Sequence, residues 1–325
     1  MRLNFENFTG EMNEMGRNGT PFLFIIDYEM NNPIICPLED AAKRGLFYFV
    51  KGLRNYEPSA LAGEPLIFAK YPMDYTDYLE AFHNVASEIG LGNTFLLNLT
   101  FPTAIETNWS LRKIFEKSDA PYRLLVEDRF VVFSPECFVR LNDGIISSFP
   151  MKGTIDASFP DAEHVILADE KEKAEHATIV DLIRNDLSMV SSQVQVKKYR
   201  YLDQIVTNDK TLLQVSSEIS GQLPPNYKNN LGTIIGQLLP AGSICGAPKA
   251  STLRIIKETE GYERGYYTGI FGVFDGTNLD SAVMIRFIEQ KEDKMCYKSG
   301  GGITMHSDPA KEYQELIDKV YAAAH

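Results

Sequence analysis

The sequence has few of the residues that build disulfide frameworks, zinc sites and hydrolytic triads. Its four cysteines lie far apart and form no CxxC pair, so we expect neither a structural zinc site nor a disulfide framework. The five histidines show no Ser/His/Asp or Cys/His order, and we predict no hydrolytic triad. Free thiols are typical of a reducing compartment, which indicates a cytoplasmic protein.

Positive charge and long apolar runs are also scarce. The chain has 32 Lys+Arg against 44 Asp+Glu, a net charge of -12, which disfavours nucleic acid or an anionic membrane as a partner. An anionic ligand would therefore need a local basic pocket. No segment approaches the roughly 20 apolar residues of a membrane span, and no apolar signal-peptide stretch follows Met1. We expect a protein with no nucleic-acid and no membrane partner.

No Gly/Ser-rich or Pro-rich linker and no repeat divides the chain, so we predict a single domain over residues 1–325. Short β-like runs bounded by Gly, Asn and Asp alternate with helical patterns. Some strands follow one another directly, as in residues 269–287, which favours an α+β fold with mixed or antiparallel sheets over a doubly wound parallel sheet. Helices are expected near 39–55, 75–90, 110–117, 170–188, 231–238, 247–260 and 309–323.

The helix predicted within residues 169–187 carries two acidic side chains beside its apolar stripe. At about 100° per residue, Glu172 and Glu175 fall on or next to that stripe, whereas Asp181 points away. Inward carboxylates are costly unless a cation or hydrogen-bond donors compensate them, so the pair indicates a metal site or acid–base chemistry. A solvated first turn rich in Lys and Glu is the alternative for this helix alone.

A second Glu-x-x-Glu pair occurs in the helix predicted within residues 307–321, where Ser307 or Asp308 can cap the N-terminus. Glu312 and Glu315 flank the buried stripe of this helix. Two such pairs could converge on one hard cation, and Mg²⁺ suits a site with few protein ligands and retained water better than Ca²⁺ does.

Two small-residue segments could meet an anion through backbone N–H groups. Gly300, Gly301 and Gly302 end a predicted strand, although a plain hairpin turn explains them equally well. Residues 240–258 lead into a helix beside Lys249, although an ordinary helix that starts at proline explains this segment nearly as well.

Lys152, in "SFPMKGT", stands between an apolar run and a Gly-Thr step. A lysine at a strand end is usually a solvated charge, but an amine held in an apolar corner can lose its proton and act as a nucleophile. These residues alone leave both readings open.

Taken together, several segments resemble the chorismate-utilising enzymes in order and approximate spacing, over at least residues 75–323. This family includes the anthranilate, aminodeoxychorismate, isochorismate and salicylate synthases. The segments are "NLT", "PMKGT", "EKAEHATIVDLIRNDL", "GSICGAPK", "RGYYTGIFG", "AVMIRF" and "GGGITMHSDPAKEYQELIDK". The resemblance implies an α+β fold with two large sheets packed between outer helices, and Mg²⁺ between acidic side chains and a substrate carboxylate.

The resemblance also implies roles for individual residues. Glu175 and Glu315 match the closest metal ligands, and Glu172 and Glu312 match residues that orient them directly or through water. The groups that hold the substrate's carboxylates are matched by Tyr267, Arg286, Lys319 and the backbone of Gly300 and Gly302, and Thr154 and Ser243 match polar contacts near the ring. The residues expected to act in catalysis are Lys152, Thr154 and Gln214.

In the family pattern Pro-x-x-Gly-Thr, lysine at the position of Lys152 marks the aminodeoxychorismate branch. The implied chemistry is attack of a neutral amine on C2 of chorismate as the C4 hydroxyl leaves, followed by addition of ammonia at C4. It requires a lowered pKa for Lys152 and an acid that the sequence does not identify. No glutaminase signature is present, so we expect a separate glutaminase subunit or free ammonium to supply ammonia.

Three departures from the family pattern affect this reading. Gln214 stands where a histidine thought to assist at C4 usually occurs, which leaves a non-catalytic chorismate-binding protein as an alternative. Cys245 replaces the usual Thr or Ser. The N-terminal region is shorter than in the large members and lacks the Leu-Leu-Glu-Ser element associated with tryptophan binding, so we expect no inhibition by tryptophan. The alternative within the family is anthranilate synthase component I, which releases pyruvate.

Overall fold

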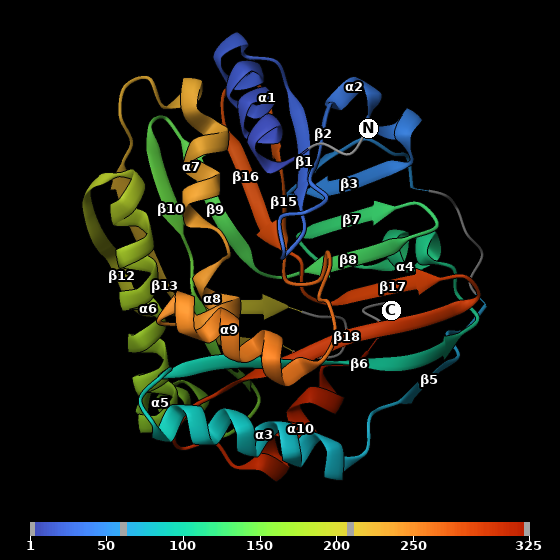
Figure 1. Ribbon diagram of the computed structural model, residues 1–325, viewed down its shortest axis with the longest axis vertical. Helices are drawn as coiled ribbons and strands as arrows, with labels where there is room; N and C mark the ends of the chain where they lie inside the picture. Colours follow the sequence, from blue (N-terminus) through green and yellow to red (C-terminus); the bar gives the residue numbers. More distant parts are fainter. Residues whose placement is uncertain (1–3, 59–63, 207–210, 322–325) are drawn as a thin grey trace.

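The computed structural model describes residues 4–58, 64–206 and 211–321, which form two antiparallel sheets that face each other (Figure 1). The first sheet has the order β11 (Met151–Asp156), β13 (Thr211–Gln222), β10 (Ile145–Ser148), β9 (Cys137–Asn142), β16 (Leu279–Val283), β15 (Ile270–Phe274), β1 (Phe22–Ile26) and β2 (Ile34–Pro37), and β12 (Ser192–Val206) pairs with β13. The second has the order β14 (Gly246–Ala247), β6 (Leu96–Thr107), β18 (Lys294–Ile303), β17 (Phe287–Lys291), β8 (Phe130–Ser134), β7 (Tyr122–Val126), β3 (Leu46–Val50) and β4 (Leu53–Arg54), and β5 (Phe68–Tyr71) pairs with β6.

The alternation of side chains along β1 explains how the layers pack. Every residue of this strand is buried, because successive side chains point to opposite faces of the sheet and both faces are covered. Leu23 and Ile25 join the core between the two sheets, whereas Phe22, Phe24 and Ile26 join the core between the first sheet and its helices. The predicted α+β architecture is therefore confirmed, with each sheet lying between the other sheet and an outer helical layer.

The helices cover the outer faces of the sheets (Figure 1). Helices α1 (Phe5–Asn18), α6 (Glu170–Val190), α7 (Leu231–Leu238) and α8 (Gly242–Cys245) pack on the first sheet, and α5 (Ala162–Ala168) lies against β11. Helices α3 (Tyr75–Gly90), α9 (Lys249–Glu260) and α10 (Pro309–Asp318) pack on β6 and β18, and α4 (Leu111–Lys117) packs on β7 and β8. Among the described residues, no helix is both long and apolar enough to span a bilayer.

The structure corrects three expectations about the elements. Residues 39–55 do not form one helix: a short α2 (Leu38–Ala41) precedes β3, whose alternating burial is that of a strand. Helix α1 was not predicted; it begins after Asn4, whose side chain accepts a hydrogen bond from the Asn7 N–H. Gly300, Gly301 and Gly302 lie at the end of strand β18, as predicted, and pair with β6, so the alternative of a hairpin turn is wrong.

Candidate functional site

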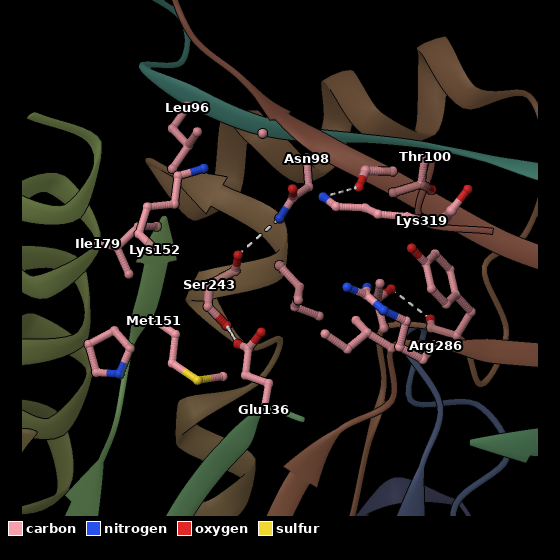
Figure 2. Close-up of a pocket in the computed structure, with 18 of the residues that line it drawn as sticks. Leu96, Asn98, Thr100, Glu136, Met151, Lys152, Ile179, Ser243, Arg286 and Lys319 are labelled. Atoms are coloured by element: carbon pink, nitrogen blue, oxygen red, sulfur yellow. Dashed lines mark hydrogen bonds between the residues drawn. The ribbon is translucent and has the colours of Figure 1, made fainter. Parts of the chain in front are cut away.

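A cavity of about 180 Å³ lies where the first sheet, the second sheet and helices α6, α8 and α10 approach one another (Figure 2). Most of the residues predicted for the site are found in its wall. The predicted residues that line it are Lys152, Glu175, Ser243, Tyr267, Arg286, Gly300, Gly302 and Lys319.

Lys152 reaches this cavity from β11. Gly153 has a left-handed φ of 80°, and the pairing of β11 with β13 shifts between Met151 and Thr154, so the strand is irregular where the lysine projects. The Nζ of Lys152 lies 2.7 Å from Oε2 of Glu175, whose side chain is only 7% exposed.

This ion pair contradicts one expectation about Lys152. Burial acts to lower the pKa of the amine, but Glu175 outweighs it, with further contributions from Glu172 and Glu315, and the pKa of Lys152 is raised above its ordinary value. The predicted lowered pKa is therefore wrong for the protein alone. The amine is held as a cation by the carboxylate beside it.

The two Glu-x-x-Glu pairs lie on α6 and α10. Glu175 lines the cavity, whereas Glu172, Glu312 and Glu315 are not part of its wall. Their helices begin as the sequence indicates, since the side chains of Asp169 and Asp308 accept capping hydrogen bonds. Glu175 and Glu312 are buried, whereas Asp181 is exposed as predicted.

Glycine backbone lies next to three of the four carboxylates. A Cβ placed on Gly301 would lie 3.4 Å from an oxygen of both Glu312 and Glu315, and one placed on Gly153 would lie 3.3 Å from an oxygen of Glu172. Both pairs therefore lie against glycine backbone, where a larger residue would crowd the carboxylates.

These carboxylates fit a magnesium ion by the chemistry of their donors. All four supply oxygen, which Mg²⁺ prefers, and glycine backbone lies beside three of them. In the described part of the chain, no three His, Cys, Asp or Glu side chains are already gathered as a metal site. Instead, a lysine neutralises one carboxylate of each pair: Lys152 lies 2.7 Å from Glu175, and Lys319 lies 2.6 Å from Glu315.

Arg286 and Lys319 form a basic wall of the cavity, which supplies the local positive charge that an anionic ligand would need in this acidic protein. Arg286 has a left-handed φ of 55°, and its Nε donates a hydrogen bond of 2.9 Å to the Tyr321 hydroxyl. The Nζ of Lys319 donates to the Gly300 carbonyl at 2.8 Å. Burial lowers the pKa of Lys319, against the opposing effect of Glu315. The guanidinium of Arg286, which is held by a neutral hydroxyl, and the nearby Lys319 suit a ligand with carboxylates.

The glycines of β18 allow close approach of the neighbouring strand. A Cβ on Gly300 would lie 2.3 Å from the Leu99 carbonyl oxygen, a distance that real Cβ atoms do not show. Gly300 and Gly302 line the cavity, so the lack of side chains there leaves room for a ligand against the backbone.

Glu136 is a site residue that the sequence did not reveal. It lies between β8 and β9 and accepts a hydrogen bond of 2.7 Å from the Ser243 hydroxyl, while the Ser243 carbonyl accepts one of 2.9 Å from Asn98 (Figure 2). Burial raises the pKa of Glu136, although the Ser243 hydrogen bond and nearby cations oppose this. A carboxyl group with a raised pKa is suited to proton donation. The only signal in the sequence is a single acid between two strongly apolar strands.

Two residues predicted to be catalytic lie elsewhere. Thr154 and Gln214 face each other across β11 and β13, where the Gln214 amide donates a hydrogen bond of 3.3 Å to the exposed Thr154 hydroxyl. Neither lines the cavity. Cys245 is buried with its thiol 3.8 Å from the Tyr28 hydroxyl, and it does not line the cavity either. These departures from the family pattern therefore lie outside the wall of the cavity.

Lys249 does not form an anion site at the start of α9. Its Nζ lies 2.8 Å from Oδ2 of Asp186 and donates a hydrogen bond of 3.1 Å to the Leu238 carbonyl. The charge is already paired with a carboxylate from α6.

Comparison with known proteins gives the family. An uncharacterised PabA-like protein of Haemophilus influenzae is 52% identical over 318 residues, which covers 97% of this chain and 96% of the relative. Anthranilate synthase component 1 of Haloarcula marismortui is 34% identical over 74% of this chain and 51% of its own length, and aminodeoxychorismate synthase component 1 of Bacillus subtilis is 29% identical over 77% and 55%.

A solved structure shares the fold. A 2,3-dihydroxybenzoate-specific isochorismate synthase of Bacillus anthracis superposes with a TM-score of 0.74 over 98% of this chain and 88% of its own, at 19% identity. The family described as chorismate binding enzyme matches residues 17–325. With this match over most of the sequence, the chain belongs to the chorismate-binding enzyme family.

Proposed function

We propose that this protein is the synthase component of an aminodeoxychorismate synthase, which converts chorismate and ammonia into 4-amino-4-deoxychorismate, the precursor of 4-aminobenzoate and folate. One observation carries the proposal: the cavity has the amine of Lys152 in its wall, and the same wall includes the half-buried carboxyl group of Glu136. A nucleophile and an acid that share one cavity suit a displacement in which a hydroxyl group leaves.

The basic wall would orient the substrate. Arg286 and Lys319 would bind the carboxylates of chorismate, and Tyr267 and the backbone of Gly300 would lie against the ring. Glu172, Glu175, Glu312 and Glu315 would hold Mg²⁺, which would supply charge for binding the ring carboxylate and would neutralise the carboxylates that face Lys152. Fixing the ring against these groups brings C2 within reach of the amine.

The two displacements use Lys152 as the nucleophile and Glu136 as the acid. Lys152 first releases a proton to solvent. Its neutral nitrogen then forms a bond to C2, the ring double bond shifts, and the C4 hydroxyl leaves as water with a proton from Glu136. Ammonia then forms a bond to C4, the double bond shifts back, and Lys152 leaves C2 as a neutral amine. The new ammonium group returns one proton to the Glu136 carboxylate, so the acid is regenerated.

A separate glutaminase subunit is the proposed source of ammonia in the cell. The sequence shows no glutaminase signature. Free ammonium salt should therefore replace the partner in the assay.

Product analysis tests the proposal. Purified protein is incubated with chorismate, Mg²⁺ and ammonium chloride, and the products are separated and identified by mass spectrometry. We expect 4-amino-4-deoxychorismate without pyruvate. Anthranilate with pyruvate would assign the protein to the anthranilate branch, and chorismate binding without any product would show a non-catalytic member.

A further inference from the structure

The three residues that follow α10, residues 319–321, contact both cations of the basic wall. We call this segment the α10 tail. Its first residue, Lys319, lines the cavity, whereas Tyr321 lies outside the cavity wall and accepts a hydrogen bond of 2.9 Å from the Nε of Arg286. Val320, between them, is only 2% exposed and packs in the core between the second sheet and α4. A buried residue therefore holds in place the segment that connects the two cations.

Tyr321 belongs to a small cluster that holds Arg286. Arg286 lies between β16 and β17, and its carbonyl accepts a hydrogen bond of 3.1 Å from the Phe133 N–H. The guanidinium carbon of Arg286 lies 5.4 Å from the centre of the Tyr321 ring, and that ring packs edge to face against Phe133. Neither Tyr321 nor Phe133 lines the cavity, so the backbone and the side chain of Arg286 are both held by groups outside its wall.

This arrangement leaves one end of the guanidinium for a ligand. Among the described residues, the only hydrogen bond that the guanidinium of Arg286 donates is the one from Nε to Tyr321. The two terminal nitrogens remain, and in a fixed plane they can bind both oxygens of one carboxylate. Figure 2 shows Arg286 and Lys319 across the cavity from Lys152, where such a carboxylate would keep the substrate in front of the amine.

Lys70, from β5, fixes the α10 tail itself. Its Nζ donates hydrogen bonds of 2.7 Å to the Ile317 carbonyl and 3.2 Å to the Val320 carbonyl. A cation is favoured at the C-terminal end of a helix, where the carbonyl groups point outward. Because the Val320 carbonyl lies between Lys319 and Tyr321 in the chain, one lysine outside the cavity wall restrains both residues.

We propose that Tyr321 and Lys70 are positioning residues for chorismate, Tyr321 by orienting Arg286 and Lys70 by holding the α10 tail. The inference rests on the proposed role of Arg286 in binding a carboxylate of chorismate. A guanidinium that is already oriented loses little side-chain freedom when the ligand binds, whereas a free one has to be ordered at that moment. Removal of the Tyr321 hydroxyl should therefore weaken binding, although no group that touches the ligand is lost.

The effect should appear in KM and not in kcat. A carboxylate that is bound away from the reacting carbons is held equally well in the ground state and in the transition state. Loss of such binding raises KM and leaves kcat nearly unchanged. A general disturbance of the site would instead lower kcat as well.

The first experiment compares Tyr321→Phe with Tyr313→Phe. The Tyr313 hydroxyl, on α10 itself, donates a hydrogen bond of 2.6 Å to the Met73 carbonyl, so this control loses one hydrogen bond that does not reach Arg286. The Kd for chorismate with Mg²⁺ is measured by calorimetry without ammonium, and kcat and KM are measured with ammonium chloride. We expect Kd and KM to rise about tenfold in Tyr321→Phe, with kcat within about threefold, and to keep their wild-type values in Tyr313→Phe.

A double-mutant cycle tests whether Tyr321 acts through Arg286. Arg286→Lys keeps the charge but has no Nε, so it cannot make the hydrogen bond to Tyr321. In this background, we expect Tyr321→Phe to change the Kd by less than about twofold. An equal tenfold loss in both backgrounds would overturn the inference, because the effect would not pass through the guanidinium.

The role of Lys70 is tested by a pair of substitutions. Lys70→Met keeps an apolar side chain of similar length but removes the cation, and its Kd for chorismate should rise about tenfold. Lys70→Arg keeps a cationic donor and should bind chorismate within about threefold of the wild type. A wild-type Kd in Lys70→Met would overturn the part of the inference that concerns Lys70.

Binding and turnover separate this inference from the proposed function. A wild-type Kd in Tyr321→Phe would overturn the role of Tyr321 and leave amination intact. A wild-type Kd in Arg286→Lys would overturn both the proposed role of Arg286 and the inference. A native protein that binds chorismate but makes no aminated product would overturn the proposed function alone, because the positioning is measured by the Kd.

Discussion

Replacement of Glu136 by glutamine tests the acid that the proposed mechanism requires. Glutamine keeps the size of the side chain and an oxygen that can accept the hydrogen bond from Ser243, which is 2.7 Å long in the native protein. It cannot give a proton to the departing hydroxyl. Loss of general acid catalysis costs about 10²- to 10⁴-fold in kcat, which corresponds to about 2.7–5.4 kcal/mol in the barrier.

The pH dependence separates a lost acid from a disturbed structure. Because burial raises the pKa of Glu136 above the ordinary 4.5, its acid form persists to a higher pH than that of an exposed glutamate. The wild-type kcat should fall as the pH rises through the raised pKa, and this fall should be absent from Glu136→Gln. Rates of 4-amino-4-deoxychorismate formation between pH 6 and pH 9, at saturating chorismate, Mg²⁺ and ammonium, provide the measurement.

The same shift predicts an effect on stability. Between the ordinary pKa of a glutamate and the raised pKa of Glu136, the folded protein binds more protons than the unfolded chain, so the free energy of unfolding decreases as the pH rises. Glu136→Gln removes this cost, and its Tm should exceed that of the wild type near pH 8 but not near pH 4. A variant with kcat within about threefold of the wild type would refute the role of Glu136 as the acid.

Three further predictions follow from the site. Lys152→Ala should reduce the rate of amination by about 10³-fold or more, because the nucleophile is removed, and should still bind chorismate in a calorimetric titration. Amination at the wild-type rate would exclude the covalent route. Chelation with EDTA should abolish turnover, and added Mg²⁺ should restore it; full turnover after exhaustive chelation would rule out a metal. Gln214→Ala should keep kcat within about threefold, because Gln214 bonds to Thr154 outside the cavity; a loss of 100-fold would show that Gln214 acts in turnover.

Local periodicity allowed most of the long helices to be predicted. The apolar stripes of α3 and α6 extend over about three turns, so tertiary contacts and local pattern agree. The segment 39–55 has no such stripe. Its aromatic residues alternate between buried and half-buried positions in β3, and pairing with β7 determines its structure.

The residues of the candidate site also differ in whether the local sequence predicts them. Lys152 and the two glutamate pairs belong to short motifs, so the sequence indicates them directly. Glu136 acquires its role from a contact with Ser243, 107 positions away in the sequence, and no local spacing records that contact. The partner of Lys249 is likewise supplied by another helix, which is why an anion site seemed possible at the start of α9.

The candidate site takes residues from both sheets, so the core between the sheets sets the distances within the site. Lys152 comes from the first sheet and Glu136 from the segment leading into it, whereas Gly300 comes from the second sheet and Lys319 from the end of α10. The distance between the nucleophile and the carboxylate-binding groups is therefore set by the apolar core between the sheets, which includes Leu23, Ile25, Phe130 and Phe271. A displacement of about 1 Å between reacting groups can cost about 100-fold in rate. Dense packing between the sheets is thus part of what orients the substrate against Lys152, although none of these core residues touches the cavity.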